Sequence, residues 1–132
     1  MCPKTNRFPP TVNAMSVPMA LVLVMSLATP CWAQGTQNIR TRDEFLALVE
    51  GARLSTLGMV MRIRGDGSIT GRAFGTPLRG TWDWSDTYFC SALRFGGRNH
   101  ARNCQTVMVI SHTLRMTEDE GRGLFTDFWL RR

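Results

Sequence analysis

The sequence has little of the chemistry that metal centres and catalytic sites require. It contains only two histidines and four cysteines, and none of them stand at the spacing of a zinc site. Ser111, His112 and Asp127 are the residue types of a hydrolytic triad, but no G-x-S-x-G turn presents the serine. The sequence therefore predicts no catalytic residues, no metal site and no cofactor.

The sequence also lacks an apolar run long enough to cross a bilayer, which takes about 18 residues. Its most apolar stretch, VPMALVLVMSLA at residues 17–28, follows two basic residues and precedes small residues at Cys31 and Ala33. That layout is typical of a secretory signal peptide. Acylation at Cys31 is the less favoured alternative, because a proline stands directly before it. We therefore expect cleavage after Ala33, a single periplasmic or secreted domain of residues 34–132, and no permanent membrane span.

Lysine is almost absent, since Lys4 is the only one and every basic residue of the mature domain is arginine. The whole chain has a net charge of +6 and ten acidic residues. The acidic residues are interspersed with the arginines, and no long basic run of the kind that binds nucleic acid occurs. We expect a solvated surface of mixed charge and no nucleic-acid partner.

Cysteine is limited to one pair after the predicted cleavage site, Cys90 and Cys104. Two cysteines are too few for a structural zinc site, and free thiols are oxidised in the compartments that signal peptides lead to. A bond between them would close a short loop and stabilise the fold by about 3 kcal/mol. The sequence therefore predicts a structural disulfide.

The hydrophobic period changes along the mature domain. Thr41 and Glu44 have capping-box spacing, and apolar residues then recur at helical spacing, which predicts a helix over residues 42–50. Residues 57–63 alternate with period two, which predicts one strand. Asp66-Gly67 then predicts a tight hairpin with positive φ at both positions.

Further turn signals follow at intervals of about 8 to 12 residues, and they predict about seven short strands. The expected fold class is mainly β, a small antiparallel meander barrel of lipocalin-like type with one N-terminal helix across one end. A two-sheet sandwich is the alternative.

Aromatic side chains are the first group of candidates for recognition. A small domain needs large side chains for its core, so core packing is the favoured interpretation of these residues. The alternative is that they line a ligand cavity. The candidates for that cavity are Trp82, Trp84, Tyr88 and Trp129.

A predicted hairpin rich in arginine is the second candidate. Several guanidinium groups on one loop suit a carboxylate or phosphate, although a solvated loop tip is the favoured interpretation. The candidates for anion or partner binding are Arg94, Arg98, His100 and Arg102.

Four motifs occur together between residues 66 and 105: D-G-x-I-x-G-R-A-F-G, G-x-W-x-W, Y-F-C and N-C-Q. With them, nearly all of the mature domain resembles a group of short exported proteins of α-proteobacteria, chiefly Rhodobacter relatives. Members often carry the label dihydrodipicolinate reductase, which implies an NAD(P)H-dependent enzyme of lysine biosynthesis. Such reductases resemble dinucleotide-binding βαβ domains with a G-x-x-G-x-x-G loop and an H-H-x-x-K-x-D segment, and this sequence has neither.

Three classes of function remain open. We expect an exported, non-enzymatic binding or interaction module of the cell envelope, a monomer that engages an envelope protein or a small ligand. The alternative is an enzyme such as the reductase, which saturable NADPH binding would support. A structural envelope protein is the third class, and a surface without a pocket or an apolar patch would favour it.

Overall fold

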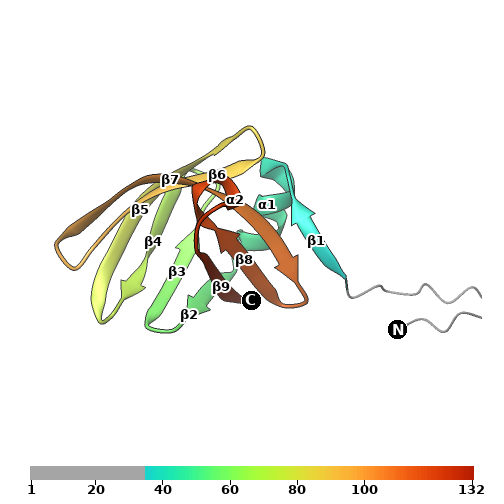
Figure 1. The fold of residues 1–132 in the computed structure, drawn as a ribbon. Helices are drawn as coiled ribbons and strands as arrows, with labels where there is room; N and C mark the ends of the chain where they lie inside the picture. The colour runs from blue at the N-terminus through green and yellow to red at the C-terminus, as the bar shows by residue number, and fades with distance from the viewer. Residues whose placement is uncertain (1–34) are drawn as a thin grey trace, which may run out of the picture. The chain divides into compact units, whose positions relative to one another are not determined.

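The computed structural model describes residues 35–132, so the predicted signal peptide lies outside the described residues. The described chain forms nine strands and two short helices (Figure 1). In chain order these are β1 (Thr36–Ile39), α1 (Arg42–Val49), β2 (Arg53–Thr56), β3 (Met59–Ile63), β4 (Ser68–Ala73), β5 (Thr76–Ser85), β6 (Tyr88–Phe95), β7 (Arg98–Ile110), β8 (Thr113–Thr117), α2 (Glu118–Gly121) and β9 (Phe125–Arg131).

Strands β2 to β9 form a closed antiparallel barrel of eight strands. Each strand pairs with the next along the chain, and β9 returns to pair with β2, with Leu54 opposite Leu130. β1 is an additional strand that pairs with the end of β7, where Thr36 lies opposite Ile110. Closure leaves the barrel strands with paired neighbours on both sides. The predicted antiparallel barrel is confirmed, and the sandwich alternative is wrong.

The expected count of about seven strands is wrong, because two strands escaped the sequence pattern. The alternation over residues 57–63 begins in a turn at Leu57 and Gly58, and β2 lies before that turn, where no strand was predicted. Leu57 is 91% exposed instead of facing the core, and Gly58 adopts a φ of 76° that suits the turn. β1 has a single buried residue, Ile39, so it carries no alternating pattern.

Helix α1 begins and ends close to its predicted bounds, but β1 precedes it in the domain. The capping box is formed: the amide of Glu44 donates to Thr41 Oγ1 at 3.3 Å, and Glu44 Oε2 accepts from the amide of Thr41 at 3.1 Å. Arg42 Nη2 donates to the Gly65 carbonyl oxygen in the β3–β4 turn at 2.7 Å. The helix therefore lies against the end of the barrel that carries this turn.

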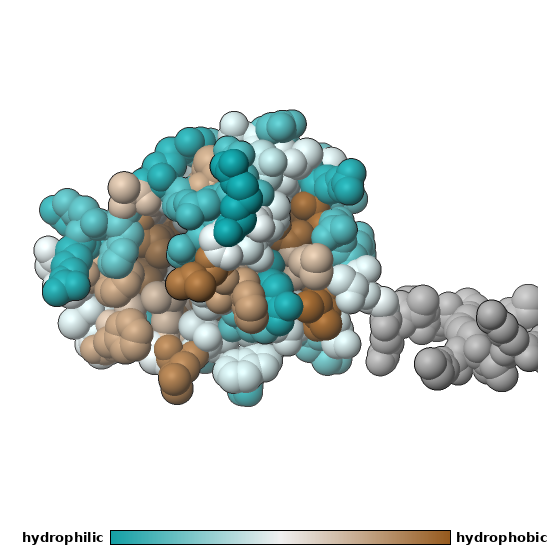
Figure 2. Space-filling view, viewed as in Figure 1, coloured by the Kyte–Doolittle hydropathy of each residue, from teal (hydrophilic) through white to brown (hydrophobic). Residues whose placement is uncertain are grey.

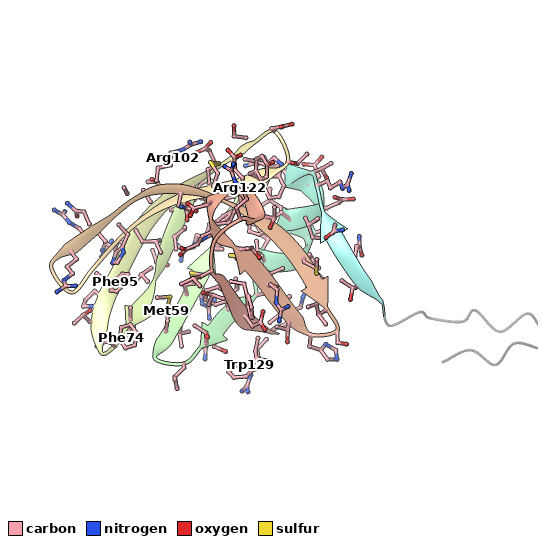
Figure 3. The ribbon with its side chains drawn as sticks, viewed as in Figure 1. Met59, Phe74, Phe95, Arg102, Arg122 and Trp129 are labelled. Carbon is pink, nitrogen blue, oxygen red and sulfur yellow. A yellow bond between two sulfur atoms is a disulfide. The ribbon has the colours of Figure 1, made fainter. Side chains whose placement is uncertain are left out.

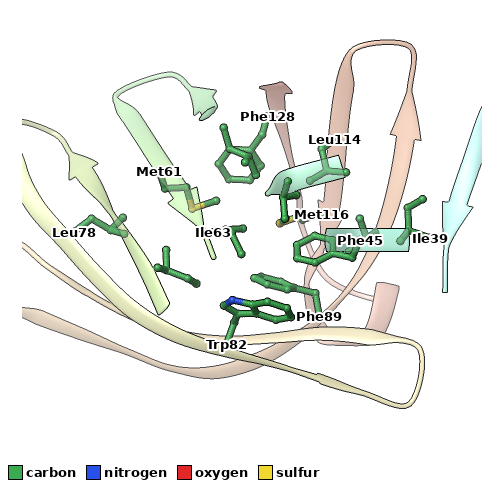
Figure 4. Packing of buried hydrophobic residues seen from close by; sticks show 14 of the residues in the cluster. Ile39, Phe45, Met61, Ile63, Leu78, Trp82, Phe89, Leu114, Met116 and Phe128 are labelled. Atoms are coloured by element: carbon green, nitrogen blue, oxygen red, sulfur yellow. The ribbon is translucent and has the colours of Figure 1, made fainter. Parts of the chain in front are cut away.

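Phe45 of α1 plugs that end of the barrel. Its ring is fully buried, and its centroid lies 4.8 Å from that of Phe89, 5.5 Å from that of Trp82 and 5.4 Å from that of Trp84. Figure 4 shows Phe45, Phe89 and Trp82 grouped at the centre of the core. The short helix is thus held to the barrel by an aromatic cluster.

The turn between β3 and β4 differs in type from the prediction. Gly67 has a positive φ of 89°, whereas Asp66 is not among the positive-φ residues. The Asp66 carboxylate instead accepts hydrogen bonds from the amide and hydroxyl of Ser68, at 2.9 and 2.6 Å. Because this side-chain bond stabilises the turn, the type I′ geometry is not needed. The hairpin was predicted correctly and its turn type was not.

The predicted disulfide is confirmed. Cys90 on β6 and Cys104 on β7 lie directly opposite each other and are bonded. Asp83 on β5 is the other cross-strand neighbour of Cys90, and Arg102 reaches it over β6 with Nη2 to Oδ2 at 2.7 Å. The ion pair and the disulfide together join three strands of the barrel wall.

Candidate ligand-binding site

The barrel contains a cavity of about 420 Å³ at the end away from α1. Its lining comes from residues of seven strands and from α2, which lie far apart in the sequence. Hydrophobic side chains form most of the wall: Met59, Met61, Ile69, Phe89, Leu93, Phe95, Met116 and Phe128. The polar lining residues are Thr56, Ser91, His100, Asn103, Gln105, Glu118 and Thr126.

The barrel is open at this end because its strands pair over only part of their length. Residues 98–105 of β7 pair with β6, whereas residues 106–110 pair with β8. β9 pairs with β2 only over residues 129–131, which leaves residues 125–128 without a partner on that side. The space between the first half of β7 and the first half of β9 therefore leads into the cavity. Figure 2 shows hydrophobic side chains that extend from the middle of the view to the lower edge of the molecule, with polar side chains mainly above them.

Helix α2 borders the opening between β8 and β9. Asn103 Nδ2 donates to Asp119 Oδ1 at 2.7 Å, and Asn103 Oδ1 accepts from the amide of Asp119 at 3.1 Å. Asp119 and Glu120 both have left-handed φ, at 52° and 57°, which costs free energy for residues with a Cβ. The paired bonds to Asn103 hold this turn against β7 and fix one side of the opening.

His100 contributes an aromatic surface to the cavity wall. Its ring stacks on Phe95 with centroids 4.4 Å apart and an interplanar angle of 11°. The two residues come from β6 and β7, close to the hairpin that joins these strands. A flat or extended apolar group that enters the cavity therefore meets a stacked pair of rings near the mouth.

The cavity floor rests on the aromatic cluster below α1. Phe89 is 2% exposed and lines the cavity with one part of its ring, while Phe45 packs behind it. Ile69 and Met61 complete the floor from β4 and β3. The floor is apolar, so the few polar groups of the site lie on its walls, nearer to solvent.

The four aromatic residues that the sequence offered for a cavity do not line this one. Trp82 is buried in the core, where its Nε1 donates to the Arg64 carbonyl oxygen at 2.7 Å. Trp84 packs on Phe45 and donates to the Asp86 carbonyl oxygen at 3.0 Å. Tyr88 is half-buried at the start of β6. Trp129 lies on the outer wall of β9 and is 56% exposed (Figure 3).

Of the four residues proposed for anion binding, Arg94, Arg98 and His100 lie near the tip of the β6–β7 hairpin, whereas Arg102 lies farther along β7. His100 lines the cavity, and the exposed Arg98 begins β7. The Arg94 Nε donates to Asn99 Oδ1 at 3.0 Å on the barrel surface. Arg102 is bound in two hydrogen bonds by Asp83, and these bonds hold the pKa of Asp83 below its ordinary value.

Some of the cavity residues follow a pattern that is readable in the sequence. Phe89, Leu93 and Phe95 alternate along β6, so they share one face of a strand, and all three line the cavity. Their alternation identifies an inward face, but an inward face is filled by core packing in most small barrels. The space beside these three side chains stays open because β7 and β9 are only partly paired, and a local sequence pattern does not reveal such long-range pairing.

Within residues 35–132, no three His, Cys, Asp or Glu side chains gather where they could hold a metal ion. The helices in this part of the chain are too short or too polar for any of them to cross a membrane. Comparisons with protein-family models, curated proteins and solved structures find no match to this chain. The functional argument therefore depends on the geometry of the barrel.

Proposed function

We propose that this chain is an exported, non-enzymatic binding protein of the cell envelope. Its cavity would hold a small ligand with an extended apolar body. The observation that carries this proposal is the apolar cavity of about 420 Å³, which opens at one end of a barrel whose other end is plugged by Phe45. Eight-stranded barrels have an interior wide enough to hold one small ligand, and ligand sites are typically apolar with a few polar groups that fix orientation.

The volume and lining define the class of ligand. A cavity of about 420 Å³ is near the lower end of the range for small-molecule sites, about 300 to 1,000 Å³. Two methionines on the inward face of β3, Met59 and Met61, have flexible side chains that adapt to ligands of different shape. Ser91, His100 and Gln105 are among the polar groups available to a ligand's head. An acyl chain with one polar end fits this arrangement.

Export is supported by two independent features. The first 33 residues have the layout of a signal peptide, and Cys90 and Cys104 form a disulfide of the kind that persists in oxidising compartments. Since every strand pairing in residues 35–132 is antiparallel, the described fold differs from the parallel βαβ domain that the reductase label implies.

The first experiment is native mass spectrometry on the protein exported by its own leader and purified gently from the periplasm. We expect the oxidised chain to retain an additional mass, released in organic solvent as an amphiphile. The delipidated protein is then titrated with dodecanoic acid by isothermal calorimetry, and saturable binding is expected. Saturable NADPH binding together with no binding of dodecanoic acid or its longer homologues would contradict the proposal.

A pair of variants links binding to the cavity. Ser91→Phe places a ring in the cavity from the β6 wall, and it should abolish dodecanoic acid binding. Thr70→Phe adds the same ring to the outer face of β4, where Thr70 lies between the exposed Arg62 and Arg79, and it should bind as the wild type does. If a folded Ser91→Phe variant binds with unchanged affinity, the cavity is not the site.

A further inference from the structure

The rim around the open end of the barrel carries most of the exposed hydrophobic surface. Six large hydrophobic side chains are exposed in residues 35–132, and three of them belong to connections between strands. Leu57 is 91% exposed in the β2–β3 connection, Phe74 71% in the β4–β5 connection and Leu124 81% in the β8–β9 connection. Phe125, which is 57% exposed, begins β9 directly after Leu124. Exposed hydrophobic side chains that gather in one region mark an interaction surface.

Phe74 is held in an unfavourable conformation at the tip of the β4–β5 hairpin. Its φ is 50° and that of Gly75 is 81°, a turn in which asparagine is the favoured first residue because a bulky side chain is strained there. The Phe74 amide donates to the Gly58 carbonyl oxygen at 2.7 Å, and its ring covers Gly58 so closely that a Cβ there would lie 2.6 Å from the ring. The β2–β3 and β4–β5 tips are thereby joined (Figure 3).

This position combines backbone strain with a ring that is mostly in water. The strain lowers stability, and the ring packs only on Gly58 and near Phe95, with 6.5 Å between the ring centroids; an Asn-Gly turn would avoid both the strain and the exposed ring. Strained residues persist where the surrounding structure holds them for a function. The ring of Phe74 also does not line the cavity, so it can act only on a partner outside the barrel.

Arginines accompany these hydrophobic tips. Arg72 donates to the Gly75 carbonyl oxygen at 2.7 Å beside Phe74, and Arg94 and Arg98 flank the neighbouring β6–β7 turn. No ion pair within residues 35–132 involves any of the three. The β2–β3, β4–β5 and β6–β7 hairpins carry no carboxylate at these tips, and the acidic residues of this end are confined to α2.

We propose that these three hairpin tips dock the barrel mouth on the surface of an anionic phospholipid bilayer. Leu57 and Phe74 enter the interface between headgroups and acyl chains, where apolar side chains gain free energy on burial. Arg94 and Arg98 face the phosphates, because basic groups are attracted to anionic leaflets. This inference rests on the proposed function and gives it a route, since a docked mouth lets an acyl chain pass between the bilayer and the cavity without crossing water.

The experiment is co-sedimentation of the oxidised protein with vesicles of phosphatidylglycerol and phosphatidylethanolamine, compared with vesicles of phosphatidylcholine. We expect association with the anionic vesicles that weakens as salt is added. Phe74→Asn should reduce vesicle affinity by about tenfold without lowering the melting temperature. Arg94→Gln and Arg98→Gln should each reduce it by about fivefold.

Trp129→Thr is the matched control, because Trp129 is an exposed aromatic residue on the outer wall, paired with Ser55 and Thr113. It should associate with vesicles as the wild type does. No association with anionic vesicles, or equal association of the wild type and Phe74→Asn, would overturn the docking proposal. Dodecanoic acid titration without vesicles separates the two proposals: intact binding there would leave the cavity function standing when docking fails.

Discussion

Replacing Phe45 with alanine tests whether α1 acts as the plug of the barrel. The ring is fully buried and lies against Trp82, Trp84 and Phe89 from two strands. α1 has only eight residues, and helices of this length are not stable without tertiary contacts. The helix therefore depends on this side chain to a large extent, and so does closure of this end.

The expected loss is in the upper part of the range for aromatic truncations. Removing a core phenylalanine costs about 3 to 5 kcal/mol, and each aromatic pair adds about 0.5 to 1.5 kcal/mol beyond its area. With three ring neighbours, we expect Phe45→Ala to lower the free energy of unfolding by about 4 to 5 kcal/mol. For a domain of this size that corresponds to a fall in melting temperature of roughly 20 °C or more.

Urea unfolding followed by tryptophan fluorescence measures this loss, because Trp82 and Trp84 both contact the removed ring. Ala47→Gly is the control on the same helix: residue 47 is exposed, so this change removes only helix propensity, about 1 kcal/mol. A Phe45→Ala variant that loses no more than Ala47→Gly would show that the barrel is closed by other contacts.

Two further changes address the barrel wall and the ion pairs. Replacing Cys90 and Cys104 with alanine should lower the free energy of unfolding by about 3 kcal/mol, measured by urea unfolding, and unchanged stability would contradict the structural role of the disulfide. Hydrogen bonds from Arg102 and Arg115 lower the pKa values of Asp83 and Asp127 in the folded protein. The stability that these two carboxylates contribute is therefore complete above about pH 4, which is their unfolded pKa. It is lost as the pH falls through the lowered folded pKa values. The Asp83→Asn, Asp127→Asn double variant should therefore lose less stability between pH 7 and pH 3 than the wild type, and an equal loss would assign the acid sensitivity to other groups.

Local sequence patterns were sufficient to predict the features that depend on residues close together in the sequence. The capping box at Thr41 and Glu44 involves four consecutive residues, and it forms as predicted. The disulfide could be predicted because a single hairpin joins β6 to β7, which places Cys90 opposite Cys104. Phe128 and Trp129 are consecutive residues of the last strand, so they face opposite sides of it, and they are 6% and 56% exposed.

Local sequence patterns did not predict the features that depend on pairing between strands far apart in the sequence. Leu57 and Gly58 match the alternating period of the strand that follows them, so the turn at these residues was not visible in the sequence. Closure depends on the pairing of Leu54 with Leu130, which are 76 positions apart in the numbering. The cavity depends on the same long-range geometry, since β9 pairs with β2 over only the last part of its length.

The closed and open ends of the barrel differ in what their side chains contribute. Phe45, Val49 and Phe89 are fully or almost fully buried near the plug, whereas Met59, Leu93 and Phe95 at the mouth are only partly buried against the core. Because large losses of stability come mainly from changes to buried core side chains, changes at the mouth should alter binding with little effect on folding. The mouth of the cavity can therefore vary in sequence to suit its ligand, while its buried floor, the plug and the disulfide maintain the barrel.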